Sequence, residues 1–199
     1  MPTAEADQVQ ISASGHSRQK CDVRDRSAYP PIATAERTWR IIAAGADAML
    51  KRCHPLFDAM GQETFVISTR PSEANLVKLS GNFLIASVLE SLGEAFALVR
   101  KSGLDPHRYL NILTSTLFSA PVYRTYGSII AEDRLPADGF KMSLGLKDMR
   151  LALAAADART VPMPVASLVR DHFIEAVAQG KGDADWSGLA QLAARRAGL

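Results

Sequence analysis

The chain has 199 residues, of which 47% are hydrophobic, and this is enough to form the core of one domain of ordinary size. Its formal net charge of +2, with no basic run longer than two residues, excludes the composition typical of nucleic-acid-binding proteins. Two cysteines, Cys21 and Cys53, are too few and too far apart for a zinc site or a disulfide framework. We therefore expect a cytoplasmic protein with no metal site and no nucleic-acid partner.

The beginning of the chain is predicted to be a disordered leader. Residues 1–30 are rich in Ser, Gln, Asp, Arg and Lys and have little apolar periodicity, so they would contribute little to a core. This segment also lacks the apolar centre of a secretory signal peptide. We therefore exclude it from the predicted fold.

Residues 31–70 are predicted to form a strand, a helix and a second strand. The strands are expected over residues 38–43 and 64–68, and the helix over residues 46–60, where Gly61 would end it. Two parallel strands alone cannot make a sheet with both faces and edges covered. This βαβ segment therefore looks like the remnant of a larger sheet, either from a missing amino-terminal domain or completed by a partner that supplies strands.

Residues 71–199 are predicted to form an all-helical domain. The longest apolar stretch, residues 74–89, begins a helix that would continue to Gly103 and would be surrounded by protein on nearly every face. Lys78, Asn82 and Glu90 interrupt its apolar character, which argues against a membrane span. Five further helices, each bounded by Gly, Pro, Asp or Ser, are expected over residues 105–117, 120–131, 144–158, 164–179 and 186–196.

Lys78 is the only ionisable residue between Glu73 and Glu90. If the helix is buried, burial of the Lys78 amine carries the usual free-energy cost of burying a charge. A desolvated lysine loses proton affinity, which would suit it to proton exchange near neutral pH. The alternative is a lysine that extends its stem along the helix and keeps its ammonium in water.

Several blocks of sequence, in this order and at this spacing, resemble the β-hydroxyacid dehydrogenases, a family that includes 3-hydroxyisobutyrate dehydrogenase and glyoxylate/succinic semialdehyde reductases. The blocks are CHPLFDAMG (53–61), NLVKLSGN (75–82), ESLGEA (90–95), GLD (103–105), Phe140, LKDMRLA (146–152) and PMP (162–164). The resemblance runs from about Trp39 to the C-terminus. It implies a mainly α-helical bundle of the type found in the C-terminal domain of 6-phosphogluconate dehydrogenase, preceded by the small βαβ remnant.

The resemblance also implies roles for individual residues. Lys78 matches the family's catalytic acid/base, and Asn82 matches an asparagine that would hold the substrate or orient the lysine. Phe140 would lie near the substrate, and Lys147 matches a lysine that contacts the NAD or NADP cofactor. Gly81 departs from the family pattern, which has a first asparagine here, and this leaves the identity of the small-molecule substrate open.

The pair Lys147-Asp148 also has a second interpretation, which does not depend on the resemblance to the family. Adjacent opposite charges on a helix are also typical of a solvated pair that contributes little to stability. The sequence leaves both interpretations of Lys147 open.

The cofactor-binding half that such enzymes need is not evident in the sequence. No Gly-x-Gly-x-x-Gly turn follows a predicted strand, and the segment Gly180-Lys181-Gly182 follows a helix. We therefore predict a truncated NAD(P)-dependent oxidoreductase, a fragment impaired when alone, that acts on a small hydroxy acid or aldehyde. The alternative is a non-catalytic dimerisation or interaction module, and in either case we expect a homodimer formed through the helical domain.

Overall fold

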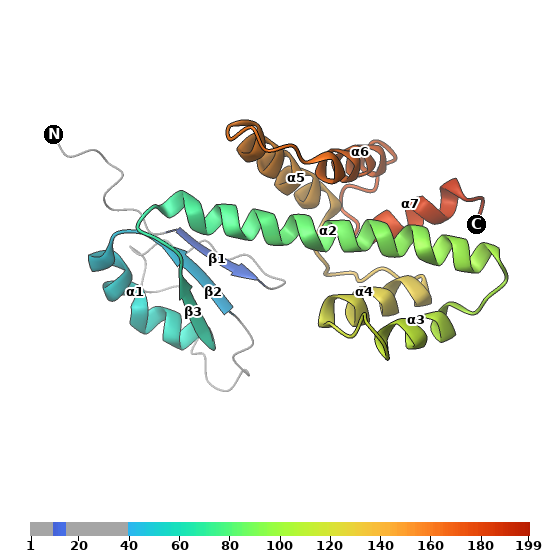
Figure 1. Ribbon diagram of the computed structural model, residues 1–199, viewed down its shortest axis with the longest axis horizontal. Helices are drawn as coiled ribbons and strands as arrows, with labels where there is room; N and C mark the ends of the chain where they lie inside the picture. Colours follow the sequence, from blue (N-terminus) through green and yellow to red (C-terminus); the bar gives the residue numbers. More distant parts are fainter. Residues whose placement is uncertain (1–9, 15–39) are drawn as a thin grey trace. The chain divides into compact units, whose positions relative to one another are not determined.

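The computed structural model describes residues 10–14 and 40–199 of the chain (Figure 1). The described residues up to Lys78 form one compact unit, and residues 79–199 form a second. The sequence predicts a boundary at residues 70 and 71, whereas the units divide inside helix α2 (Pro71–Lys101). The first two turns of this helix therefore belong to the amino-terminal unit.

The amino-terminal unit contains the predicted strand–helix–strand segment. Strand β2 (Arg40–Ala44) leads into helix α1 (Asp47–Met60), and strand β3 (Glu63–Val66) pairs with β2 in parallel. The carboxylate of Asp47 lies in the first turn of α1, where its negative charge interacts favourably with the helix dipole. The buried side chains that hold this unit together are Ile41, Ala43, Leu50, Cys53 and Phe57. The prediction of a βαβ segment is confirmed.

A third strand completes this sheet on the other side of β2. Strand β1 (Gln10–Ser14) pairs with β2 antiparallel, which gives the strand order β1-β2-β3. The sequence places these five residues in the predicted disordered leader, so at this segment the structure differs from the prediction. The rest of the predicted leader, and residues 38 and 39 of the predicted strand, lie outside the described residues.

The elements of the carboxy-terminal unit are helices. After α2 come five helices, α3 (Pro106–Thr114), α4 (Pro121–Glu132), α5 (Met142–Asp157), α6 (Pro164–Ala178) and α7 (Gly188–Arg196). In Figure 1, α2 runs between the α3–α4 pair on one side and the α5–α6 pair on the other. Each of α3, α4 and α6 begins with a proline, whose fixed φ suits the first turn and whose missing N–H needs no partner there.

Helix α2 is the central element of this unit. It is long and apolar enough to cross a membrane by length and composition alone. Within the unit, however, Ala86, Leu89 and Phe96 are fully buried against the other helices. Their spacing of three and seven residues places them on one side of the helix. This packing identifies the segment as the core helix of a folded domain.

The core of the unit contains a buried aromatic pair with a polar connection. The indole N–H of Trp186 donates a 3.0 Å hydrogen bond to the hydroxyl oxygen of Tyr126, and the two rings lie edge to face. Burial raises the pKa of the Tyr126 hydroxyl to about 12. This pair ties α4 to the segment that leads into α7.

Candidate functional site

Lys78 and Asn82 lie one turn apart on α2, so the two side chains project from the same face of the helix. Both residues are half-buried. Lys78 is therefore neither fully buried nor fully extended into solvent, and the structure lies between the two interpretations that the sequence leaves open. An ammonium in such a position can reach a small molecule placed against the helix.

Asn82 is held by a buried carboxylate from α5. Its amide Nδ2 donates a 2.7 Å hydrogen bond to Oδ2 of Asp148, whose residue is only 1% exposed. Only the NH2 end of an amide can donate to a carboxylate, so this bond decides which way the amide faces. Hydrogen bonds to charged groups are shorter and stronger than those between neutral groups. Asn82 is thus a fixed side chain one turn after Lys78.

Asp148 is a residue whose role the sequence leaves unassigned. The interpretation of Lys147-Asp148 as a solvated pair is wrong for Asp148, because the residue is buried. One signal in the sequence agrees with this: Gly145, Met149 and Ala152 have the helical spacing of an inward face, and Asp148 lies among them. Its partner Asn82 is 66 residues away, so no local pattern identifies the contact.

Lys147, next to Asp148 on α5, is exposed. Neighbouring residues of a helix point in directions about 100° apart, so one can be exposed while the next is buried. An exposed ammonium suits an anionic ligand such as the phosphate or carboxylate of a small molecule. Lys147 is thus exposed on α5, whereas its neighbour Asp148 is buried and holds Asn82.

Phe140 precedes α5 and packs partly into the core. Its ring centre lies 4.6 Å from that of Trp186 in an edge-to-face arrangement, and its carbonyl oxygen accepts a 2.7 Å hydrogen bond from the Trp186 amide. The residue is half-buried. These contacts give Phe140 a packing role at the start of α5, and its predicted contact with a substrate stays a prediction.

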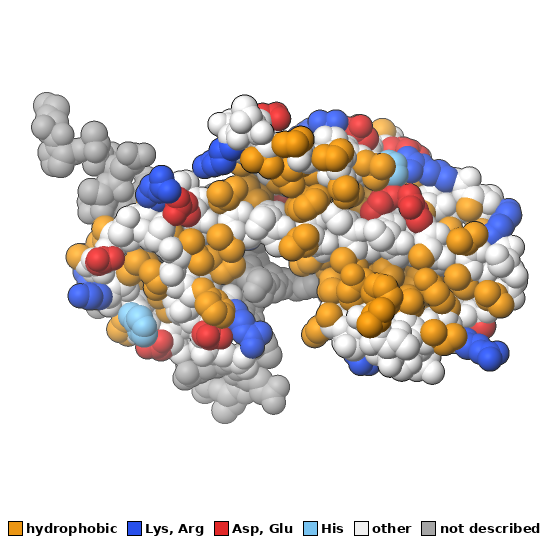
Figure 2. Space-filling view, viewed as in Figure 1, with side chains coloured by type: hydrophobic (Ala, Val, Ile, Leu, Met, Phe, Trp, Pro, Cys, Tyr) orange, Lys and Arg blue, Asp and Glu red, His pale blue; other side chains and the backbone are white. Residues whose placement is uncertain are grey.

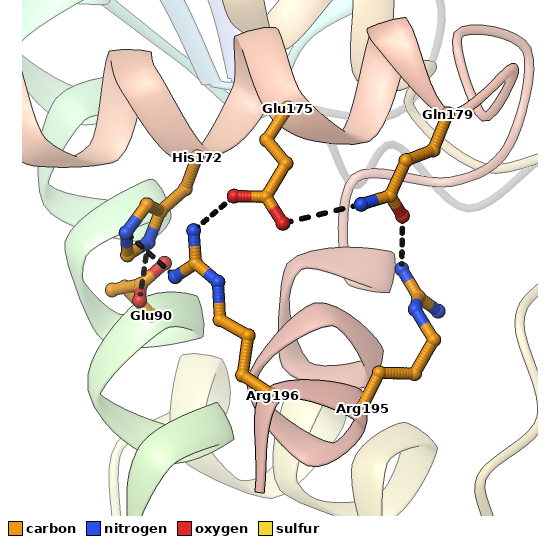
Figure 3. Close-up of polar contacts among 6 residues, drawn as sticks. All are labelled: Glu90, His172, Glu175, Gln179, Arg195 and Arg196. Atoms are coloured by element: carbon orange, nitrogen blue, oxygen red, sulfur yellow. Dashed lines mark hydrogen bonds and ion pairs between the residues drawn. The ribbon is translucent and has the colours of Figure 1, made fainter. Parts of the chain in front are cut away.

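A second polar cluster connects α2, α6 and α7 (Figure 3). Glu90, which is 6% exposed, lies 2.7 Å from His172 Nδ1, and Arg196 donates a 2.7 Å hydrogen bond to His172 Nε2. Because Nε2 accepts from Arg196, Nδ1 carries the hydrogen that is donated to Glu90. Burial raises the pKa of the Glu90 carboxyl, although the contacts with His172 and Arg196 act to lower it.

Arg196 also forms an ion pair with Glu175, which extends this cluster along α6. Each of these four side chains therefore contacts another, although Oε2 of the buried Glu90 has no hydrogen-bond partner among the described residues. We interpret the cluster as a structural connection between three helices. Among residues 40–199 no group of three or more His, Cys, Asp and Glu side chains could hold a metal ion.

Comparison with known proteins identifies the family. Residues 72–193 match the family model described as the NAD-binding domain of NADP-dependent 3-hydroxyisobutyrate dehydrogenase. This match covers more than half of the chain and contains Asn82, Asp148 and Lys147. The chain belongs to this family. The resemblance to β-hydroxyacid dehydrogenases is thereby confirmed, and with it a nicotinamide dinucleotide, NAD or NADP, as the cofactor of the family.

Individual relatives of this dehydrogenase domain agree with the family assignment. The chain is 43% identical to an uncharacterized oxidoreductase of Bacillus subtilis, YfjR, over 80% of this chain and 55% of the relative. It is 33% identical to glyoxylate/succinic semialdehyde reductase 1 of Arabidopsis thaliana, over 75% of this chain and 51% of the relative. The chain thus spans about half the length of the curated relatives it matches.

Solved structures show the same fold. The 3-hydroxyisobutyrate dehydrogenase of Salmonella typhimurium superposes with a TM-score of 0.72 at 22% identity, over 77% of this chain and 54% of that structure. The mainly helical fold class is thereby confirmed. The roles of Lys78, Asn82, Phe140 and Lys147 stay predictions at this point.

Proposed function

We propose that this chain supplies the acid–base and substrate-binding groups for hydride transfer between NAD or NADP and a small hydroxy acid or aldehyde. The observation that carries the proposal is the bond from Asn82 to the buried Asp148, on the helix face that also presents Lys78. A buried carboxylate is costly unless it is paired. Its use to fix one amide beside one lysine is typical of a site that must hold a ligand in a defined orientation.

Lys78 would act as the proton donor and acceptor. A bound nicotinamide cofactor supplies or accepts the hydride. In the reductive direction the Lys78 ammonium donates a proton to the substrate oxygen as the carbonyl becomes a hydroxyl, and it stabilises the negative charge that develops there. In the oxidative direction the neutral amine accepts the hydroxyl proton.

Three further residues would bind the substrate or the cofactor and would take no part in proton transfer. They are Asn82, Phe140 and Lys147. The Asn82 amide, held by Asp148, would hydrogen-bond the substrate and keep its oxygen within reach of Lys78. Phe140 would offer an apolar wall. Lys147 fits the cofactor because its exposed ammonium can contact an anionic or polar group of a dinucleotide. We further propose that the chain is cytoplasmic and that its activity is impaired alone, since its sequence has no Gly-x-Gly-x-x-Gly turn.

The test is NADPH-linked reduction of glyoxylate and succinic semialdehyde. Three proteins are assayed: wild type, Lys78→Ala and Lys51→Ala. Each is assayed alone and with an added dinucleotide-binding domain from a relative. Lys51 is an exposed lysine of α1 and serves as the control. We expect Lys78→Ala to lose roughly 100-fold or more of the activity, the range of general acid–base catalysis, and Lys51→Ala to match wild type. Equal activity in Lys78→Ala and wild type would refute the role of Lys78.

A second candidate function, a non-catalytic dimerisation or interaction module, is favoured by one observation. Figure 2 shows hydrophobic side chains gathered over α3 and α4. In this part of the chain Ile112, on α3, is 55% exposed, and Leu117, in the segment between the two helices, is 91% exposed. Exposed apolar patches are typical of protein interfaces, and we propose that this one belongs to a homodimer.

Calorimetric titration with NAD and NADP separates the two functions. Saturable binding in the micromolar range favours a retained role in hydride transfer. The lack of any binding, together with a dimer in light scattering, favours the interaction module.

A further inference from the structure

His172 uses both nitrogens of its imidazole ring in the cluster that connects α2, α6 and α7 (Figure 3). Nδ1 lies 2.7 Å from Oε1 of Glu90, and Nε2 lies 2.7 Å from Nη1 of Arg196. A guanidinium only donates hydrogen bonds, so Nε2 accepts the bond from Arg196 and carries no hydrogen. Nδ1 then carries the one ring hydrogen and donates it to Glu90. This arrangement therefore requires a neutral imidazole.

A proton taken up by the ring would break one of these two bonds. The proton can bind only at Nε2, because Nδ1 already carries a hydrogen. The new N–H of His172 and the N–H of Arg196 would then face each other as two donors, each on a positively charged group. Neither could accept from the other, and like charges at this distance repel. Protonation of His172 is therefore incompatible with its bond to Arg196.

Arg196 is the partner that is free to move away. It is the last residue of α7, and its side chain is 40% exposed. The side chain of His172 lies within α6 and is only 16% exposed. A protonated His172 also gains by staying in place, because its positive charge then lies against the buried Glu90 carboxylate.

The charged groups around His172 come from three helices. They are Glu90 and Glu94 on α2, Glu175 on α6 and Arg196 on α7. The three carboxylates favour a positive charge on the ring, and the one guanidinium opposes it. On α5, which also packs against α6, the buried charged residue is Asp148, and it is engaged by Asn82.

Glu175 is placed to accept a hydrogen bond from either cation. It lies three residues after His172, one turn along α6, and now forms an ion pair with Arg196. A protonated Nε2 can therefore take over this carboxylate as Arg196 leaves. The exchange needs no change elsewhere in the helix.

Two other bonds also hold the end of α7. Arg195 donates to the side-chain oxygen of Gln179, and Lys101 donates to the carbonyl oxygen of Ala197. Neither acceptor changes its charge near neutral pH. The first turns of the helix stay in place as well, because Leu189 and Leu192 are buried in the core. Loss of the bond to Arg196 would therefore loosen the last turn and leave the rest of α7 docked.

We propose that His172 is a proton-operated switch for the carboxy-terminal end of α7. Histidine ordinarily gains its charge as the pH falls from about 8 to about 5. Over this range a solvent proton bonds to Nε2, the hydrogen bond from Arg196 breaks and the last turn of α7 loosens. The docked end needs the neutral ring, so docking is favoured at the higher pH and is lost as the pH falls. This switch does not depend on the proposed function.

The test is nuclear magnetic resonance of the full chain at about pH 8 and about pH 5, the range in which histidine titrates. The nitrogen shifts of the His172 ring report its protonation, and backbone order parameters report motion in residues 195–199. His172→Gln keeps one donor and one acceptor at this position but cannot gain the proton. His54→Gln removes an exposed histidine of α1 and is the matched control. Arg196→Ala shows the end of α7 without its bond.

We expect the order parameters of the last turn to fall from about 0.85 at the higher pH to about 0.6 or less at the lower pH, in wild type and in His54→Gln. His172→Gln should show no such fall, and Arg196→Ala should have low values at both pH values. A last turn of wild type that stays equally rigid while the His172 ring is protonated would overturn the proposal. So would a fall of the same size in His172→Gln, or a His172 ring that stays neutral at the lower pH.

Discussion

Asn82 and Asp148 show how a single buried carboxylate can orient a side chain at a site. The 2.7 Å bond joins the half-buried Asn82 of α2 to the buried Asp148 of α5. The bond links the helix that carries Lys78 to the helix that carries the exposed Lys147. Small errors in the position of a substrate-binding group can reduce a rate strongly, so the bond should matter for both folding and function.

Replacement of Asp148 should affect both properties. We expect Asp148→Ala to lower the free energy of unfolding by about 1–3 kcal/mol, because the half-buried amide of Asn82 loses its acceptor. Asp157→Ala, at the exposed end of the same helix, should change stability little. Urea denaturation measures both variants. An Asp148→Ala protein as stable as the Asp157→Ala control would contradict the importance of the bond.

The burial of Tyr126 can be tested by the pH dependence of the stability of the chain. Its pKa is raised from 10.0 to about 12 in the folded chain, chiefly by burial. The unfolded chain therefore loses this proton first, so the contribution of Tyr126 is fully present below pH 10 and is lost as the pH rises to about 12. A pKa difference of this size corresponds to about 3 kcal/mol.

The variant Tyr126→Phe isolates this contribution. At pH 8 it should be less stable than wild type by about 1–3 kcal/mol, because the Trp186 indole N–H loses its acceptor. Between pH 10 and 12 the difference should shrink, since only wild type has the phenol to lose. Chemical denaturation at several pH values measures the difference. A constant difference from pH 8 to 12 would be incompatible with a raised pKa.

At the scale of elements, the connection from α2 through α6 to α7 depends on one histidine. His172 contacts Glu90 on one side and Arg196 on the other (Figure 3). Without His172 the buried Glu90 carboxylate would lose the group that most lowers its pKa. An unpaired buried charge is strongly destabilising, whereas a neutral amide in its place is less so.

We expect His172→Ala to destabilise the chain by about 1–3 kcal/mol and to speed amide hydrogen exchange in α7. Adding Glu90→Gln to this variant should restore part of the loss, because the unpaired charge is then gone. Asp171→Ala, at the exposed neighbouring residue, is the control. If the double variant is no more stable than His172→Ala, the cost does not come from the Glu90 charge.

The helices could be predicted within a few residues because their boundaries are encoded locally. The pairs Asp105-Pro106 and Met163-Pro164 mark helix starts by a cap or a fixed φ, whatever the helix packs against. Strand β1 could not be predicted, since its partner β2 lies some 30 residues away and its polar composition gives no strand pattern. The contact of Asn82 with Asp148 is likewise non-local. Lys78 and Asn82 stand out in the sequence as polar residues in an apolar helix, and their roles stay predictions.

At the scale of the whole molecule, the proposed homodimer depends on the apolar surface over α3 and α4. Leu117→Glu should shift the chain toward monomer in light scattering, because it places a charge at an exposed apolar side chain between α3 and α4. The fold should be unaffected, since the side chain is 91% exposed. Ala154→Glu, on the exposed side of α5, should leave the oligomeric state unchanged. A wild-type monomer would exclude the homodimer.

The chain spans about half the length of its curated relatives, so its proposed reaction depends on what it contributes to a complete site. The contribution we propose is the proton of Lys78. The most direct measurement is NADPH-linked reduction of succinic semialdehyde by Lys78→Ala, with the added dinucleotide-binding domain and increasing methylamine. We predict a loss of roughly 100-fold or more that methylamine partly restores by supplying the missing amine. A loss that no amine restores, or no loss at all, would contradict the assignment of Lys78 as the acid–base group.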